Sequence, residues 1–303
     1  MKISYVTTGN DGIASYRYRI ACPAVKLRDL HCQTHVEDKA KADADIVVFS
    51  KHWTYADWSY AKFCSLRGQN IVFDVCDDHY SDSLEDHYRR MTDVADLVTC
   101  NSEEMAKIIW EKTGREAEVI PDPVLSLRKP YKKADPKMVW YGQTMNIKGL
   151  YEVYSYDIDT PLEIVVPGRI DPPGYFNKPT VTWSQWNPWC ISEAVDRGAT
   201  IALLPYRQDK KAKSANRVLE ALWSGMTVIT DPLPAVMDFW QYTNTGAIQF
   251  LDGDHAKLLK DCVHYFEETD LTDDMDNVQR LIEELFSPEA VAKKWEKALC
   301  KIA

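Results

Sequence analysis

Residues 199–206 read ATIALLPY, and residues 214–231 read SANRVLEALWSGMTVITD. The apolar run Thr200–Leu204 is typical of a parallel strand that is buried on both faces. Ser214 is a suitable N-cap for a helix with apolar residues along one side, and Gly225 is suited to end that helix. Another apolar run follows at once. The stretch therefore predicts a strand, a helix and a second, parallel strand.

Positive charge gathers where this helix would begin. The cations are Lys210, Lys211, Lys213 and Arg217. Free backbone N–H groups at a helix N-terminus already favour anions, so a phosphate-sized site is predicted there. Glu220 lies one turn further into the helix. Together these residues predict a nucleoside-diphosphate ligand.

Length and charge narrow the class of protein. The chain has 303 residues, of which 45% are hydrophobic and 27% are charged, as in ordinary globular proteins. This length favours two domains. A formal net charge of −10 disfavours extended binding to nucleic acid or to anionic lipid over a broad face.

The cysteines and the apolar runs bear on location. There are eight cysteines and no C-x-x-C pair, which indicates buried free thiols in a reducing compartment. Residues Met1–Val6 become polar too early for a signal peptide, and no apolar run approaches the ~20 residues that span a bilayer. We expect a soluble, cytoplasmic protein, and peripheral contact with a membrane stays open.

Strands and helices alternate along both halves of the chain. In the first half, the predicted strands are Ile3–Thr7, Ile46–Phe49, Ile71–Val75, Leu97–Cys100 and Ala117–Ile120, with helices at Ser15–Leu27 and Glu104–Lys112. The proline-rich segment Pro121–Pro136 is typical of a linker. In the second half, the predicted strands are Met138–Tyr141, Leu162–Val166, Thr180–Trp183, Thr200–Leu204 and Ala247–Phe250, with helices at Cys190–Arg197, 255–267, 275–286 and 288–301. The pattern predicts an α/β protein with two tandem, doubly wound parallel-sheet domains facing a cleft. We place them at 1–130 and 131–287, with the helix 288–303 packing back on the first domain.

Candidate site residues follow the strands, because ligands of such sheets bind at the carboxyl ends. The turn Gly9–Gly12 precedes a helix with Arg17 and Arg19, and it lets a ligand approach the backbone or is a plain turn. His79 follows Asp77 and Asp78, where it could handle a hydroxyl proton or belong to a solvated loop.

The first strand of the second half is followed by a predicted turn that contains Gly142 and Gln143, then Lys148 and Gly149. A lysine beside glycines suits a diphosphate oxygen. Three other features favour structural roles. We expect the tryptophans Trp183, Trp186 and Trp189 to lie in the core or in an interface. We expect the basic linker Arg128–Lys137 to be solvated. The D-x-D pair Asp157 and Asp159 precedes a strand instead of following one, so it does not predict a metal site.

Several segments in one order resemble a known family. They are the glycine-rich turn after the first strand, Ala95–Ser102, Val119–Val124, Lys148–Gly149 and Asn216–Gly225. This order resembles the GT-B glycosyltransferases of group 1, the retaining family-four class. Each motif is loose, but the resemblance spans nearly the whole chain.

The resemblance implies two Rossmann-like domains, with a nucleotide-sugar donor in the C-terminal one and the acceptor in the N-terminal one. It implies transfer with retention, without a metal or another cofactor, from a UDP- or GDP-sugar. The resemblance leaves the acceptor hydroxyl unidentified, with a sugar, a glycan, a lipid-linked compound or a modified nucleotide as the candidates. Catalytic roles fall to Lys148, Glu220 and His79. The donor-binding set is Gly12, Gly142, Gln143, Lys148, Lys213, Ser214, Asn216, Arg217 and Glu220. In it, Lys148 binds the diphosphate and Glu220 the ribose hydroxyls.

The chain also departs from the family pattern. Ala212 stands where the family often has a second acid, and Gln143 stands in place of an arginine. These departures keep an alternative open, a GT-B-shaped protein that binds a nucleotide or sugar and has lost transfer. A Rossmann oxidoreductase is disfavoured because the chain lacks the G-x-G-x-x-G pattern. A transferase acting on DNA would need a basic cleft.

Overall fold

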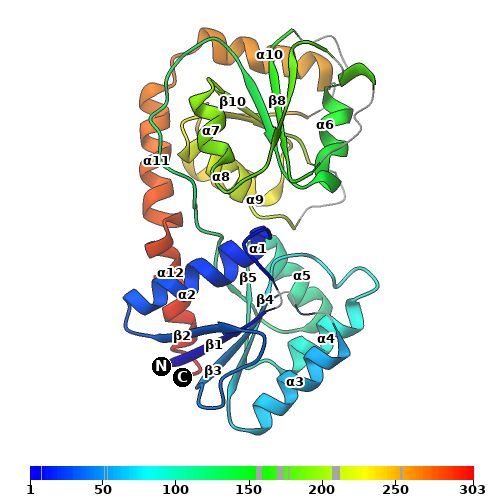
Figure 1. The fold of residues 1–303 in the computed structure, drawn as a ribbon, viewed down its shortest axis with the longest axis vertical. Helices are drawn as coiled ribbons and strands as arrows, with labels where there is room; N and C mark the ends of the chain where they lie inside the picture. Colours follow the sequence, from blue (N-terminus) through cyan, green and yellow to red (C-terminus); the bar gives the residue numbers. More distant parts are fainter. Residues whose placement is uncertain are drawn as a thin grey trace. The chain divides into compact units, whose positions relative to one another are not determined.

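The computed structural model describes residues 1–7, 9–50, 52, 54–154, 159–168, 174–176, 178–206, 212–252 and 255–303. The chain divides into two compact units (Figure 1). The first comprises Met1–Leu125, Ala212–Ser214 and Glu284–Ala303. The second comprises Ser126–Lys211 and Ala215–Glu283. Each unit is built on one six-stranded parallel sheet flanked by helices, so the α/β fold class predicted from the sequence is confirmed.

The sheet of the first unit has the strand order β2-β1-β3-β4-β5-β6, and every pair is parallel. Its strands are β1 (Lys2–Val6), β2 (Gln33–Glu37), β3 (Ile46–Ser50), β4 (Asn70–Val75), β5 (Leu97–Cys100) and β6 (Glu118–Val119). The chain order reverses between β1 and β3. In sheets of this kind, ligands bind outside the carboxyl ends of the strands at such a switch point.

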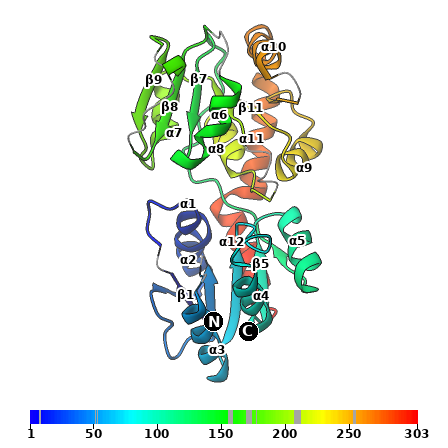
Figure 2. The same ribbon diagram turned by 90° about the vertical axis from the view of Figure 1, so that its right-hand side faces the viewer.

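Helices cover both faces of this sheet (Figure 1). One face carries α1 (Ala14–Tyr16), the π-helical turn η1 (Arg17–Ala21), α2 (Cys22–Asp29) and α12 (Pro288–Leu299). Trp295 of α12 is fully buried in one core cluster with Ile3 and Leu27. The other face carries α3 (Tyr55–Leu66), α4 (Glu85–Val94) and α5 (Glu103–Thr113), whose apolar sides form a second cluster. Helices α4 and α5 contact each other (Figure 2).

Local sequence explains where these helices begin and end. Thr54 and Asp57 form a capping box at the start of α3. Ser102 accepts a hydrogen bond from the Met105 backbone N–H at the start of α5. Gly114 ends α5 with φ +69°, a left-handed conformation that favours glycine.

The sheet of the second unit has the strand order β12-β11-β10-β7-β8-β9, again entirely parallel. Its strands are β7 (Met138–Tyr141), β8 (Leu162–Val166), β9 (Val181–Gln185), β10 (Ile201–Leu204), β11 (Thr227–Thr230) and β12 (Ile248–Phe250). Here the chain order reverses between β7 and β10. The strand, helix and second strand predicted within residues 199–231 are β10, α8 and β11.

The helices of the second unit are η2 (Thr144–Asn146), α6 (Ile147–Val153), η3 (Gly174–Phe176), α7 (Cys190–Asp196), α8 (Asn216–Trp223), α9 (Pro234–Thr243), α10 (His255–Glu268) and α11 (Thr272–Phe286). Most of them connect these strands, and the last two, α10 and α11, follow β12. The boundary between the units falls within α11. Gly225 lies just after the C-cap of α8 and has a φ of +80°. A Cβ at this position would lie 2.7 Å from the Pro130 carbonyl oxygen. The predicted place of Gly225 after the helix is confirmed.

Two local predictions are wrong. Ser214 does not cap α8, because the N-cap is Ala215 and no side chain bonds to it; the Ser214 hydroxyl bonds to Asp122 instead. Lys148 and Gly149 do not form a turn, because both lie within α6. A Cβ on Gly149 would lie 3.2 Å from the Pro205 carbonyl oxygen, so the glycine serves close packing of α6 against the end of β10.

The segment Pro121–Pro136 contains neither helix nor strand, as predicted. Several cations of the basic linker Arg128–Lys137 have partners within the second unit. Arg128 lies 3.2 Å from Glu283, Lys129 lies 2.5 Å from Asp196, and Lys137 donates to the Arg197 carbonyl oxygen. All eight cysteines are free thiols, and Cys32, Cys64, Cys100, Cys190 and Cys262 are buried.

Candidate functional site

The candidate site lies in the second unit, at the switch point between β7 and β10. Parallel sheets of this kind bind ligands outside the carboxyl ends of the strands, where the chain order reverses. Gly142 directly follows β7, and Tyr206 follows β10. Arg217 lies in the first turn of α8, the helix that follows β10.

The Arg217 guanidinium lies among three aromatic rings. Its central carbon is 5.4 Å from the ring centre of Trp140, 5.7 Å from that of Tyr141 and 5.0 Å from that of Tyr206. The Tyr141 hydroxyl donates a hydrogen bond of 2.5 Å to the Arg217 carbonyl oxygen. Burial raises the pKa of Tyr141 well above its ordinary value, so this hydroxyl stays a donor. The first turn of α8 is thus fixed against β7.

Two nitrogens of this guanidinium lack a hydrogen-bond partner. Arg217 Nε and Nη2 are buried, and no atom in the described part of the chain accepts a hydrogen bond from them. A buried donor without a partner costs about 1–3 kcal/mol, and more when it is charged. The N-terminus of α8 has no side-chain cap. A half-buried cation with two open donors beside a helix N-terminus is suited to hold an anion.

Gly142 keeps space next to this guanidinium. A Cβ at this position would lie 3.3 Å from the Trp140 ring and 3.6 Å from the central carbon of Arg217. A larger side chain would therefore fill the space in front of the cation. Gln143 and Lys148 are exposed on the same connection between β7 and α6, and Asn216 is half-buried beside Arg217.

Glu220 lies one turn beyond Arg217 and is 2% exposed. Its Oε2 accepts a hydrogen bond of 2.8 Å from the Ser126 backbone N–H. The carboxylate thereby holds the start of the linker on α8. Its binding of a ribose stays a prediction.

Other predicted site residues lie in the first unit. Lys213 forms an ion pair with Asp77, and the Ser214 hydroxyl donates 2.7 Å to Asp122 Oδ2. His79 Nδ1 lies 2.7 Å from Asp82 Oδ2. The Gly12 N–H donates to the Asn10 side chain in the turn after β1. The predicted donor-binding residues are therefore divided between the two units, and Lys210 and Lys211 lie outside the described residues.

A buried charge network in the first unit was missed from the sequence. Arg19 is fully buried, and its Nη2 lies 2.5 Å from Asp74 Oδ1. Its Nη1 is 3.4 Å from Asp122 Oδ1. Burial lowers the pKa of Arg19, but the charge and hydrogen bonds of Asp74 outweigh this effect and raise it. Burial raises the pKa of Asp122 despite Arg19. The available signal was one aspartate inside the apolar strand β4.

His52 is a second residue that the sequence analysis missed. It follows β3 at the switch point of the first sheet and is 4% exposed. Its Nε2 lies 2.8 Å from the Val6 carbonyl oxygen, and its Nδ1 lies 3.1 Å from Asp57 Oδ1. Both ring nitrogens are thus occupied, which ties β1, β3 and α3 together.

Of the two roles predicted for the tryptophans, core or interface, the core role is wrong for two of them, and the interface role stays a prediction. Trp183 is 36% exposed and Trp189 is 57% exposed, so neither belongs to the core. Asp157 of the D-x-D pair lies outside the described residues.

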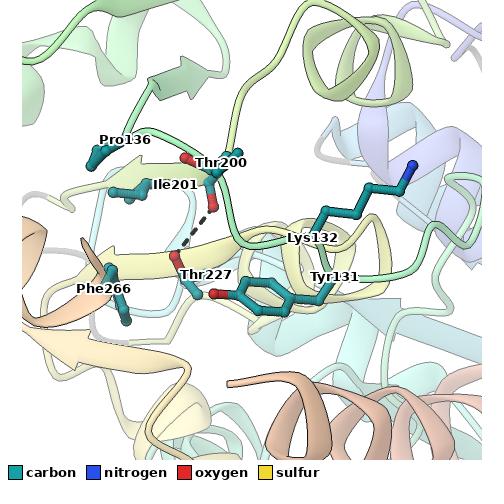
Figure 3. Close-up of a pocket in the computed structure, with 8 residues that line it drawn as sticks. Tyr131, Lys132, Pro136, Thr200, Ile201, Thr227 and Phe266 are labelled. Atoms are coloured by element: carbon teal, nitrogen blue, oxygen red, sulfur yellow. Dashed lines mark hydrogen bonds between the residues drawn. The ribbon is translucent and has the colours of Figure 1, made fainter. Parts of the chain in front are cut away.

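Three further features carry no site. A small pocket lies at the amino ends of β10 and β11, where Thr227 donates to the Thr200 carbonyl oxygen (Figure 3). This edge is opposite to the one where such sheets bind ligands. Among the described residues, His264, Glu267 and Glu268 cluster on α10, and all three are exposed. No helix in the described ranges is long and apolar enough to cross a membrane.

Comparison with known proteins places the fold. No protein-family model and no curated protein matches the sequence. Solved structures match over 99% of this chain at low identity. HepE of Anabaena in complex with UDP and glucose has a TM-score of 0.72, 12% identity and 100% of its own chain covered. A glycosyltransferase of Rickettsia africae has a TM-score of 0.68 and 12% identity, with 98% of its own chain covered. Sucrose-phosphate synthase of Thermosynechococcus elongatus has a TM-score of 0.67 and 10% identity, with 98% of its own chain covered. The fold is that of GT-B glycosyltransferases.

Proposed function

We propose that this protein is a glycosyltransferase that takes a sugar from a nucleoside-diphosphate donor bound in the second unit. The observation that carries the proposal is the half-buried Arg217, whose guanidinium has two buried donors without a partner at the switch point. A diphosphate supplies the acceptors that these donors lack. The structural likeness to glycosyltransferases over the whole chain supports the same assignment.

The donor we propose is a UDP-sugar. One similar structure holds UDP and glucose, and another holds UDP-glucose. No such observation favours a GDP-sugar. Arg217 and Lys148 would face the diphosphate, with Gly142 leaving room for it. Glu220 would take the ribose hydroxyls beside its bond to Ser126.

The finer chemistry belongs to the proposal and follows the family resemblance. It comprises hexosyl transfer with retention and without a metal, in a cytoplasmic protein. No protein nucleophile is then needed, because a phosphate oxygen of the donor accepts the proton of the attacking hydroxyl. Lys148, Arg217 and the N-terminus of α8 would stabilise the charge on the departing diphosphate. The acceptor, bound by the first unit in this proposal, is an unidentified hydroxyl compound.

The test is a thermal-shift screen with the nucleotides UDP, GDP, ADP, dTDP and CMP, and with the common nucleotide sugars of each. A ligand that binds only the native state raises the unfolding midpoint. We expect UDP and UDP-sugars to raise it and the Arg217→Met variant to lose that shift. A parent protein that responds to none of these compounds would remove the donor site.

One observation favours a second candidate, a binding protein that has lost transfer. Ala212 occupies the position of the second family acid, and it is buried in the core cluster of the first unit. Nucleotide binding without any release of UDP from UDP-sugars, even with a broad set of acceptors, would select this candidate.

A further inference from the structure

Helix α3 exposes an apolar face. Tyr55 is 65% exposed, Phe63 is 51% exposed and Leu66 is 80% exposed. Their spacing of eight and three residues, with the exposed Ser59 between them, brings them to one side of a helix. Large apolar side chains grouped in this way on a soluble protein mark an interaction surface more often than chance exposure.

The charges around this face are positive. Lys62 Nζ lies 5.5 Å from the centre of the Trp58 ring, and the Arg67 guanidinium lies 5.5 Å from that of Phe63. Helix α4 lies beside α3 (Figure 1). The guanidinium of Arg90 on α4 lies 5.8 Å from the ring centre of Tyr55 and 5.6 Å from that of Trp58. In the described part of the chain none of these three cations forms an ion pair with a carboxylate.

The nearby acids do not neutralise the face. Asp57 is the acid of α3, and it accepts hydrogen bonds from Thr54 while it lies 3.1 Å from His52. Burial raises the pKa of Asp57, but the bonds from Thr54 and His52 outweigh it and lower the pKa overall. On α4, Glu85 pairs with Arg89, and Asp86 and Asp93 are exposed without a bond to Arg90.

The residues of this face indicate which kind of partner it binds. The whole chain carries a net charge of −10, so three cations without a carboxylate partner around exposed rings are a local exception. Three cations are few for a nucleic acid. A second copy of the chain would place the same cations against each other across a two-fold axis. Apolar and aromatic side chains bordered by lysine and arginine match the boundary between acyl chains and anionic headgroups.

We propose that the α3 face (Tyr55, Trp58, Lys62, Phe63, Leu66, Arg67 and Arg90) docks the protein on an anionic lipid bilayer. Phe63 and Leu66 enter the headgroup boundary, while Lys62, Arg67 and Arg90 meet the lipid phosphates. The aromatic rings keep the cations extended toward that plane. Docking needs no donor nucleotide, so it stands or fails independently of the proposed transferase activity.

The test is flotation of the full chain with vesicles of phosphatidylcholine, with and without phosphatidylglycerol, at low and high salt. We expect binding only to the vesicles that contain phosphatidylglycerol, with loss at high salt. Lys62→Glu combined with Arg67→Glu lowers the partition coefficient at least about 20-fold. Phe63→Ser combined with Leu66→Ser lowers binding while it preserves the charge.

The matched control is Lys107→Glu combined with Trp110→Ser on α5, where Trp110 is 55% exposed in the same unit. This variant should bind vesicles as the parent does, and all variants should melt as the parent does. Absence of vesicle binding, or equal binding by the α3 variants, would overturn the proposal. Concentration-dependent dimers that the α3 substitutions abolish would reassign the face to a second copy.

Discussion

Replacing Arg217 by methionine separates ligand binding from folding. Methionine keeps much of the length and apolar stem but removes the guanidinium. In the parent, two buried nitrogens lack partners, which costs about 1–3 kcal/mol each, while three aromatic contacts return about 0.5–2 kcal/mol each. These terms nearly cancel. We therefore expect the free energy of unfolding without ligand to change by less than about 2 kcal/mol.

The effect on nucleotide binding should be much larger. Two hydrogen bonds from a charged donor to phosphate contribute about 1.5–3 kcal/mol each, so their loss weakens binding by at least about 100-fold. Isothermal titration with UDP measures this directly. The control is Arg128→Met, because Arg128 also lies over a ring, that of Trp223, but pairs with Glu283. An Arg217→Met protein that binds UDP as tightly as the parent would refute the assignment of the site.

The remaining predictions concern donor chemistry, buried charge and backbone. Lys148→Ala should lower turnover by at least about 30-fold if Lys148 contacts the leaving diphosphate, and near-normal turnover would remove it from the mechanism. Glu220→Gln keeps an acceptor for Ser126 but should weaken UDP binding about 10-fold, and unchanged affinity would contradict the ribose role. Asp74→Asn breaks the buried pair with Arg19 and should cost about 3–5 kcal/mol in urea unfolding, whereas Asp122→Asn should cost far less. Because the pKa of Asp122 is raised, its contribution to stability is complete below the unfolded pKa and is lost as pH rises through the folded pKa. The stability of Asp122→Asn relative to the parent should therefore increase with pH above about 4, and a flat difference would contradict this account. Gly225→Ala should destabilise the protein by more than about 2 kcal/mol through backbone strain and contact with Pro130, while Gly114→Ala, with open space around it, should cost about 1 kcal/mol; equal melting points would contradict the contrast.

The fold was largely predictable because its strands are continuous apolar runs. Leu97–Cys100, Met138–Tyr141 and Leu162–Val166 have the predicted bounds. The edge strand β2 (Gln33–Glu37) was missed because it is polar and half-exposed, so it lacks that signal. Helix α3 was missed as well, because its exposed Phe63 and Leu66 disturb the usual pattern of one apolar side.

The candidate site was predictable only in part. Gly142 was named because it follows a strand at its carboxyl end, and Arg217 because it belongs to a group of cations at a predicted helix start. The rings of Trp140, Tyr141 and Tyr206 were not, because only the fold brings a strand end, a loop and a helix together. Lys213 and Ser214 precede α8 in sequence, yet their side chains bond within the first unit. Sequence neighbours of a helix start need not point at the same ligand.

The central claim, transfer from a nucleotide sugar, is tested most directly by measuring UDP release from UDP-glucose and related UDP-sugars. The parent and the Arg217→Met and Arg128→Met variants should be compared with and without a set of acceptor alcohols. The account predicts UDP release by the parent and by Arg128→Met, stimulated by a suitable acceptor, and its loss in Arg217→Met. A parent protein that binds UDP but releases none from any UDP-sugar with any acceptor would contradict the claim.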